Sequence, residues 1–344
     1  MSRLQRRVLV ARLDADGDVL LAGPAVRAVA AAARVVLLVG PRGRHAAELL
    51  PGVDHVVEWA APWIEPAPAP AGSRQHVDTM VDEIRKLDVE EAVVLTSFHQ
   101  SALPLALLLR MAGVERIGAV SEDYPGSLLD VRLPDPGDLP EAERALAVAG
   151  ATGFPLPDGD DGRLDVRRPL PETATVTGPG RYVVLHPGTS VPSRAWPVER
   201  WTDTAALLTR LGHRVVVTGG PGETALTRRV AAHGGHGGLD LGGRTSFPEL
   251  ADVLDRAAVV VVGNTGPAHL AAAVRTPVVS LFAPTVPASR WAPYGVPVVL
   301  LGDQRAACRA SRATTCPVPG HPCLTSVTAE DVAGALDRLM EVAA

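Results

Sequence analysis

The stretch from residue 257 to residue 283 places the strongest constraint on how this chain can fold. Residues 259–262 are four consecutive valines, a run typical of a strand buried on both faces. The small-residue turn 263–266 follows, and Pro267 favours the first turn of a helix because the N–H it lacks has no partner there. After an Ala-rich segment, a second apolar strand is indicated at 278–282. This βαβ unit predicts a parallel sheet, and the start of its helix predicts a seat for a phosphate.

The same alternation of strands and helices runs along the whole chain and predicts an α/β fold of doubly wound sheets. Further strands are indicated at 8–10, 35–39, 55–58, 92–96, 117–120, 182–185, 215–218 and 239–241. The alternation stops in a Pro- and Gly-rich segment and then restarts, which indicates a domain boundary. We predict an N-terminal domain over 1–160, a linker over 161–180, a C-terminal domain over 181–327 and a final helix over 328–344.

Composition narrows the class of protein. The chain has 344 residues, of which 47% are hydrophobic, and a net charge of −5. It lacks a basic, aromatic-interleaved patch, so no nucleic-acid partner is expected. No apolar run is long enough to span a membrane and no signal peptide is indicated, so we expect a cytoplasmic protein for which peripheral membrane contact remains open. Three cysteines, an odd number, fit a reducing compartment.

Three loops of the second half should converge, because the carboxyl ends of parallel strands meet at one edge of a sheet. The first loop carries the hydroxyls of Thr189 and Ser190 and the guanidinium of Arg194. The second carries Glu223, and the third, residues 264–269, offers backbone N–H groups at Thr265, Gly266 and Ala268. This set suits a diphosphate, with the carboxylate accepting hydrogen bonds from ribose hydroxyls. Taken singly, each residue could instead serve a turn, a helix end or the surface.

In the first half, Asp14, Asp16 and Asp18 crowd the turn after the first strand. One interpretation is helix capping, for which Asp is a favoured residue. The other is general-base catalysis, since a carboxylate across the interdomain cleft from a diphosphate could take a proton from an acceptor. The residues alone do not separate these two interpretations.

Four motifs, in order, resemble those of glycosyltransferase family 9, the bacterial heptosyltransferases. They are VLVARLDADGDVLLAGPAVRAV (8–29), HPGTSVPSRAWPVERW (186–201), VVVTGGPGE (215–223) and VVVGNTGPAHLAAAVRTPVVSLFAP (260–284). The resemblance covers residue 8 to the end and is weakest between about 60 and 160. It implies a GT-B fold, in which two Rossmann-like domains face each other and the last helix returns toward the first. It also implies a metal-independent, inverting transfer from a nucleotide-sugar donor, typically ADP-heptose, with no cofactor.

The resemblance assigns roles to matching positions. Asp18 matches the family's base, Arg194 stands where the family usually has Lys, and Glu223 matches the carboxylate that binds ribose. Asn264 replaces the usual Asp, which puts a contact to the donor sugar in doubt. Pro267 and His269 also match the last motif; His269 is expected to support the loop.

On the acceptor side we name Asp14, His99 and Trp63, the last as a platform for a sugar ring or an anchor for its loop. Because residues 57–73 carry Glu58 and Glu65 but no basic residue, we predict a neutral or cationic acceptor, either a glycan or a small molecule. Alternatives are another GT-B nucleotide-sugar enzyme, such as a UDP-sugar transferase or an epimerase, and a non-catalytic nucleotide-sugar binding protein. Cys308, Cys316 and Cys323 lack a CxxC pair, so no metal site is expected.

Overall fold

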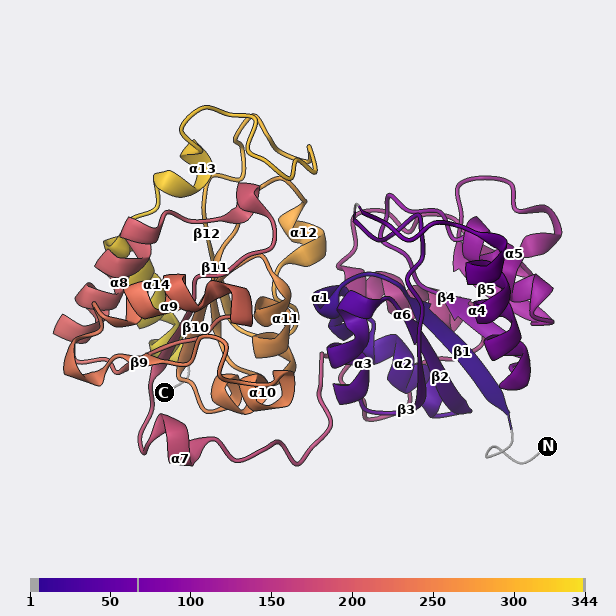
Figure 1. The fold of residues 1–344 in the computed structure, drawn as a ribbon, viewed down its shortest axis with the longest axis horizontal. Coiled ribbons are helices and arrows are strands. Elements are labelled where there is room, and N and C mark those ends of the chain that lie inside the picture. Colours follow the sequence, from indigo (N-terminus) through magenta and orange to yellow (C-terminus); the bar gives the residue numbers. More distant parts are fainter. Residues whose placement is uncertain (1–5, 67, 343–344) are drawn as a thin grey trace. The chain divides into compact units, whose positions relative to one another are not determined.

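Residues 6–66 and 68–342 are described here in a computed structural model of the chain. The chain divides into two compact units, Met1–Arg167 and Arg168–Ala344 (Figure 1). Each unit contains one six-stranded sheet, and every pair of neighbouring strands is parallel. The predicted α/β class is therefore confirmed.

The sheet of the first unit has the strand order β3-β2-β1-β4-β5-β6. Its strands are β1 (Arg7–Arg12), β2 (Arg34–Val39), β3 (Val53–Glu58), β4 (Glu91–Val94), β5 (Arg116–Val120) and β6 (Val131–Leu133). Its helices are α1 (Asp16–Leu21), α2 (Gly23–Ala30), α3 (Arg44–Leu49), α4 (Arg74–Lys86), α5 (Leu103–Met111) and α6 (Glu141–Ala151), with 3-10 turns η1 (Pro41–Gly43) and η2 (Gly126–Leu128). The order reverses between β1 and β4, and α/β proteins bind ligands at the carboxyl ends beside such a reversal.

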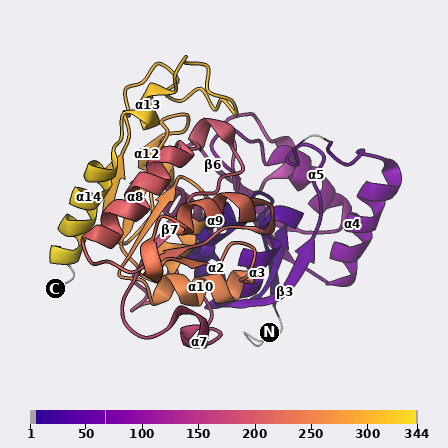
Figure 2. The ribbon, with the colours of Figure 1, turned by 60° about the vertical axis from the view of Figure 1, so that its left-hand side comes forward.

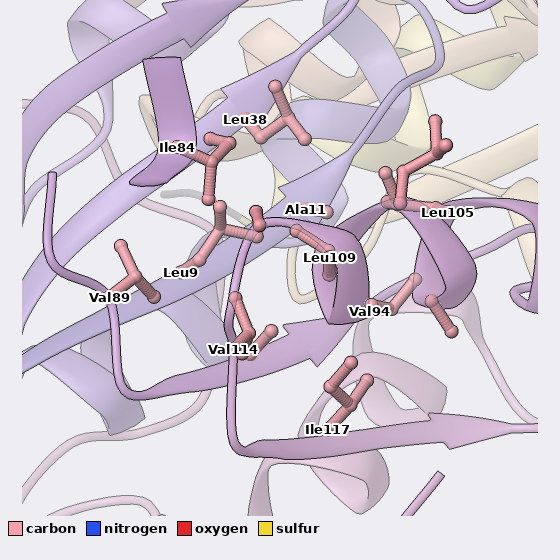
Figure 3. Packing of buried hydrophobic residues seen from close by; sticks show 14 of the residues in the cluster. Leu9, Ala11, Leu38, Ile84, Val89, Val94, Leu105, Leu109, Val114 and Ile117 are labelled. Carbon is pink, nitrogen blue, oxygen red and sulfur yellow. The ribbon is translucent and has the colours of Figure 1, made fainter. Parts of the chain in front are cut away.

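Strand β1 lies at the centre of this unit and is buried from Val8 onward. On one face, Leu9 and Ala11 pack with Ile84 of α4 and Leu109 of α5 (Figure 3). Burial of a large aliphatic side chain contributes about 1.5–3 kcal/mol, so this packing holds β1 firmly. The residues that follow β1 therefore start from a fixed position.

The second unit repeats the same arrangement, with the strand order β12-β11-β10-β7-β8-β9. Its strands are β7 (Val183–His186), β8 (Val215–Val217), β9 (Leu239–Asp240), β10 (Val259–Gly263), β11 (Val278–Leu281) and β12 (Val298–Leu301). Its helices are α7 (Ala174–Thr177), α8 (Val198–Arg210), α9 (Thr224–Ala231), α10 (Phe247–Asp255), α11 (Gly266–Ala273), α12 (Ala288–Trp291), α13 (Pro322–Thr325) and α14 (Ala329–Val342), with 3-10 turns η3 (Pro192–Arg194), η4 (Pro221–Glu223) and η5 (Gly235–Gly237). The reversal here falls between β7 and β10, the strands that carry two of the three predicted loops.

The contacts of helix α14, the predicted final helix, group it with the second unit. It lies beside α8 (Figures 1 and 2), and Leu336 and Leu339 belong to the same core as Leu208 of α8. The reason is its apolar face, which is buried against α8 and the sheet of the second unit.

Several residues of the Pro-rich segment 161–180, the predicted linker, pack or form hydrogen bonds within one of the two units. Leu164 and Val166 are buried, and Arg167 N–H donates to Leu49 O in the first unit at 2.6 Å. Thr173 donates through both its N–H and its hydroxyl to Asp252 of α10, at 2.9 and 2.6 Å. Contacts up to Arg167 are thus made with the first unit, and those of Thr173 are made with the second.

Candidate functional site

The carboxyl end of β1 carries a buried arginine surrounded by carboxylates. The side chain of Arg12 is 2% exposed. Its Nε lies 2.9 Å from Asp14 Oδ2, its Nη2 lies 3.1 Å from Asp18 Oδ1, and both Nη atoms lie 3.3 Å from Glu141 Oε2. Nη2 also donates to Ser97 Oγ at 2.8 Å. Four side chains of the first unit, those of Asp14, Asp18, Ser97 and Glu141, thus contact one guanidinium.

The aspartates after β1 do not cap helix α1. Its N-cap residue is Ala15, which has no side-chain cap hydrogen bond. Asp16 accepts from the backbone N–H of Ala46 at 2.9 Å, and Asp18 lies within the first turn with its carboxylate on Arg12. Neither residue therefore caps α1, whereas Asp16 binds a free amide in the first turn of α3, as a capping residue does.

Burial sets the electrostatics of the cluster. It raises the pKa of Asp14 and of Glu141, although Arg12 acts in the opposite direction on both. Burial opposes the charge of Arg12 as well, yet Asp14, Asp18 and Glu141 together raise its pKa. Arg12 is therefore a permanent cation.

Gln100 links this cluster to the β4–α5 loop. Its Nε2 donates to Asp14 Oδ1 at 2.6 Å, and its Oε1 accepts from Ser97 N–H at 3.0 Å. Arg12, Ser97, Gln100 and Glu141 were not among the predicted site residues. The only local signal was an arginine at the last position of a buried strand, directly before the aspartates.

The predicted acceptor-side residues differ in their surroundings. Trp63 is 40% exposed and lies edge-on to buried Trp59, with ring centroids 5.4 Å apart. With Gln100 and other residues of the β4–α5 loop, Trp63 lines a shallow pocket of the first unit. His99 is exposed, with its ring edge-on to Phe98 at 5.3 Å. The tryptophan pair thus anchors its loop and still leaves part of the Trp63 ring open.

The charge argument for a neutral or cationic acceptor does not hold in the structure. Glu58 Oε2 lies 3.3 Å from Arg44 Nη1, and Glu65 Oε2 lies 3.0 Å from Arg42 Nε. Both arginines come from the neighbouring segment after β2. Each carboxylate of the loop therefore has a guanidinium partner, and the loop is not an uncompensated acidic surface.

In the second unit, the loop after β7 reaches the loop after β10. Arg194, in η3, donates from Nη1 to the backbone oxygen of Asn264 at 3.1 Å. The loop after β8 joins them through Glu223. A Cβ built on Gly188 would come within 2.0 Å of Glu223 Oε1, so only glycine at 188 allows this approach. The predicted convergence of the three loops is thus present in the structure.

Several polar groups predicted for a ligand bond within the chain. Thr189 Oγ1 accepts from Val191 N–H at 3.2 Å, as in an ordinary turn, whereas Ser190 is exposed. Glu223 Oε2 accepts from Gly220 N–H at 2.7 Å. The buried side chain of Asn264 makes two long contacts with the backbone of Ala283, donating at 3.5 Å and accepting at 3.4 Å. An aspartate could not donate the first of these, which is a physical reason for Asn at this position.

The N-terminus of α11 offers fewer amides than predicted. Thr265 N–H donates to Gly263 O at 2.9 Å and Ala268 N–H to Thr265 O at 3.1 Å, while Pro267 has no N–H. Within residues 6–66 and 68–342, no acceptor is found for Gly266 N–H, and the buried Thr265 Oγ1 has no hydrogen-bond partner. These two groups, with Arg194, are the donors that an anion could meet here. His269 follows on α11 and is buried.

Below Glu223 lies a buried histidine. His186 Nδ1 is 2.9 Å from Thr218 Oγ1. Burial lowers the pKa of His186 to about 4, although the charge of Glu223 acts in the opposite direction. His186 is therefore neutral near pH 7.

The segment that carries Cys308, Cys316 and Cys323 packs beside the loop after β7. Ser193 Oγ donates to Ala313 O at 2.6 Å, and Trp196 Nε1 donates to Leu324 O at 3.0 Å. Burial, with Cys308 and Cys316 nearby, raises the pKa of Cys323 to about 11. In the part of the chain that the structure describes, no group of three or more His, Cys, Asp or Glu side chains is arranged to hold a metal ion. No helix of the described residues is long and apolar enough to cross a bilayer.

The two Rossmann-like units place the chain in the GT-B class of α/β proteins. One unit carries the carboxylates around Arg12, and the other carries three loops with donors that an anion could meet. The model of one family, described as glycosyltransferase family 9 (heptosyltransferase), matches residues 86–321. The chain belongs to this family.

A curated relative is lipopolysaccharide heptosyltransferase 3 of Escherichia coli K12, which is 34% identical over 112 residues. That match spans 30% of this chain and only 31% of the relative. Similar solved structures are the family 9 glycosyl transferase of Veillonella parvula, with a TM-score of 0.77 at 18% identity and 99% of both chains covered, and the ADP-heptose lipopolysaccharide heptosyltransferase II of E. coli, with a TM-score of 0.74 at 19% identity, covering 98% of this chain and 99% of that one. At these identities the structures show a shared fold.

Proposed function

We propose that this chain is an inverting, metal-independent glycosyltransferase. It moves a heptose or a related sugar from a nucleotide-sugar donor, ADP-heptose, to a hydroxyl group of a glycan or small-molecule acceptor. Family membership supports the reaction class. The single structural observation that carries the proposal is Asp18, a partly exposed carboxylate that is held by a buried arginine and does not cap its helix.

Asp18 is the general base of the proposed reaction. It accepts the proton of the acceptor hydroxyl while that oxygen attacks the anomeric carbon, and the bond from this carbon to the diphosphate oxygen breaks as the nucleoside diphosphate leaves. Its side chain is 24% exposed, against 1% for Glu141, so among the carboxylates on Arg12 it is better placed to meet a substrate than Glu141. A single displacement of this kind inverts the anomeric configuration.

The second unit holds the donor in this proposal. Arg194 binds the diphosphate and stabilises the charge that develops on it, with Gly266 N–H and the hydroxyls of Thr265 and Ser190 as further donors. Glu223 accepts hydrogen bonds from the ribose hydroxyls. Because Arg194 supplies the positive charge, the transfer needs no metal, and activity is expected to survive treatment with EDTA.

A panel of nucleotide sugars tests the reaction class. The purified chain is incubated with ADP-heptose and with GDP- and UDP-sugars, and the released nucleotide is identified by chromatography. Release of ADP from ADP-heptose alone, with an inverted anomeric centre in the NMR spectrum of the product, is the expected result. Release of UDP would instead point to a UDP-sugar enzyme, and binding without release to a non-catalytic protein.

Replacing the base separates catalysis from binding. We expect Asp18→Asn to lower kcat about 10²–10⁴-fold, the range for loss of a positioned base. Calorimetry is expected to show unchanged ADP affinity, because the proposed donor contacts belong to the second unit. Asp16→Asn is the matched control, since an amide oxygen can still accept from Ala46 N–H. Undiminished turnover in Asp18→Asn would show that Asp18 is not the base.

We also propose a cytoplasmic location, because the three cysteines are all free, as in a reducing compartment.

A further inference from the structure

The guanidinium of Arg12 has more hydrogen-bond acceptors around Nη2 than that nitrogen has hydrogens. Its Nη2 has two hydrogens but three acceptors within reach, namely Ser97 Oγ at 2.8 Å, Asp18 Oδ1 at 3.1 Å and Glu141 Oε2 at 3.3 Å. Asp18 and Glu141 therefore compete for the same N–H group. A change that weakens the interaction of Glu141 with Nη2 therefore strengthens the interaction of Arg12 with Asp18.

Glu141 comes from a distant part of the chain and has no place in the proposed reaction. It is the first residue of α6, 129 positions after Arg12, and its side chain is 1% exposed. A carboxylate is rarely buried unless it is paired. Its burial beside Arg12 indicates that it acts through Arg12 and does not itself meet a substrate.

The other charges near the cluster belong to identifiable partners. Arg144 of the same helix acts on Glu141, and Arg42 of η1 acts on Asp14. Asp16 lies 3.6 Å from His45 Nδ1 on α3. Arg12 is the positive charge that all three carboxylates, Asp14, Asp18 and Glu141, share.

We propose that Arg12 and Glu141 are positioning residues for Asp18: Arg12 aims its carboxylate, and Glu141, by competing for Nη2, limits how firmly Arg12 holds that carboxylate. This inference rests on the proposed role of Asp18 as the base. It adds a control on that base by Glu141, which lies outside the four sequence motifs.

The two residues should shift the pH dependence in opposite directions. In Glu141→Gln a negative charge disappears, Arg12 interacts more strongly with Asp18, and the ionised base becomes less basic. The acidic limb of the kcat/KM profile should then move to lower pH by about one unit, and kcat at the optimum should fall several-fold. In Arg12→Lys the ammonium group cannot reach all the acceptors, so the limb should move to higher pH and kcat should fall with little change in the donor KM.

The experiment records kcat/KM between pH 4.5 and 9 for the full chain and these variants, with circular dichroism as a check of folding. Glu143→Gln is the matched control, because it removes the same charge from the same helix and leaves in place the Glu141 carboxylate that lies 3.3 Å from both Nη atoms of Arg12. A second measurement follows the carboxyl ¹³C resonance of Asp18 against pH, assigned with Asp18→Asn. If Glu141→Gln fails to fold, Glu141→Asp replaces it, since its shorter side chain withdraws the carboxylate from Nη2.

The proposal is supported if the acidic limb of the kcat/KM profile shifts in opposite directions in Glu141→Gln and Arg12→Lys and does not shift in Glu143→Gln. A folded Glu141→Gln variant whose profile and Asp18 titration both superimpose on those of the unmodified chain overturns it. The NMR titration does not depend on turnover. If the unmodified chain released no nucleotide from any donor, the proposed function would fail, while the coupling between Glu141 and Asp18 would still be measured.

Discussion

At the scale of single residues, burial decides which side chains keep their ordinary chemistry. His186 is the first residue of the motif 186–201, which was predicted to contribute to a ligand site. Its ring, however, is buried and bonded to Thr218. Arg12 is equally buried but keeps its charge, because carboxylates surround it. The same degree of burial thus gives a neutral histidine in one unit and a permanent cation in the other.

The lowered pKa of His186 makes stability depend on pH. The pKa rises from about 4 in the folded chain to about 6.5 on unfolding, so the unfolded state binds more protons between these values. Stability should therefore be lost as pH falls from about 6.5 to 4, by about 2–4 kcal/mol from this residue. His186→Gln should flatten that part of the profile measured by urea unfolding, whereas His233→Gln, at an exposed position, should leave it unchanged. An equally steep profile in His186→Gln would contradict the assignment.

At the scale of elements, short segments carry the site and longer helices carry the stability. Helix α11 has eight residues, and Asn264, two positions before its start, accepts a hydrogen bond from Arg194 in the loop after β7. Helix α14 has fourteen residues and buries one face against α8 and the sheet. The final helix therefore stabilises the sheet that positions the three loops.

A pair of substitutions in α14 tests this division. Leu336 is fully buried in the core of the second unit, whereas Met340, one turn later, is 36% exposed. Leu336→Ala should cost about 2–5 kcal/mol of unfolding free energy, and Met340→Ala should stay within about 0.5 kcal/mol. Chemical denaturation measures both. Equal losses would mean that this helix face is not packed as described.

At the scale of the whole molecule, two sheets with the same strand order carry different parts of the proposed catalytic site. In each, candidate residues lie at the carboxyl ends of the two strands beside the reversal of order, β1 and β4 or β7 and β10, and in the second unit Glu223 follows the next strand, β8. The first unit supplies the proposed base and the second the proposed donor contacts. Each unit has a separate hydrophobic core.

This division predicts where ADP protects the chain. With ADP at a hundred times its Kd, bound regions gain about 2.7 kcal/mol against opening. Hydrogen exchange of the full chain should slow in residues 186–194, 219–223 and 264–269 and should stay unchanged at 13–18. Protection confined to the first unit would contradict the assignment of the donor site.

Local pattern was enough to predict the α/β class, most strands and the three converging loops. Runs such as 259–262 are buried wherever they occur, and parallel strands bring their carboxyl ends together whatever lies between them. Two edge strands, β6 and β12, were not predicted, since both are short and only partly buried. The family motifs likewise marked Asp18 and Arg194 because these residues lie within continuous stretches of sequence.

Tertiary structure alone decided which of the marked groups remain available and what surrounds them. No pattern shows that Thr189 closes a turn, that Asn264 bonds Ala283, or that Glu141 reaches Arg12 across 129 residues. Such contacts depend on the packing of distant elements, and the energy of a charge depends on everything that packs around it. The sequence therefore determined the fold and the position of the site, whereas the folded chain determined its electrostatics.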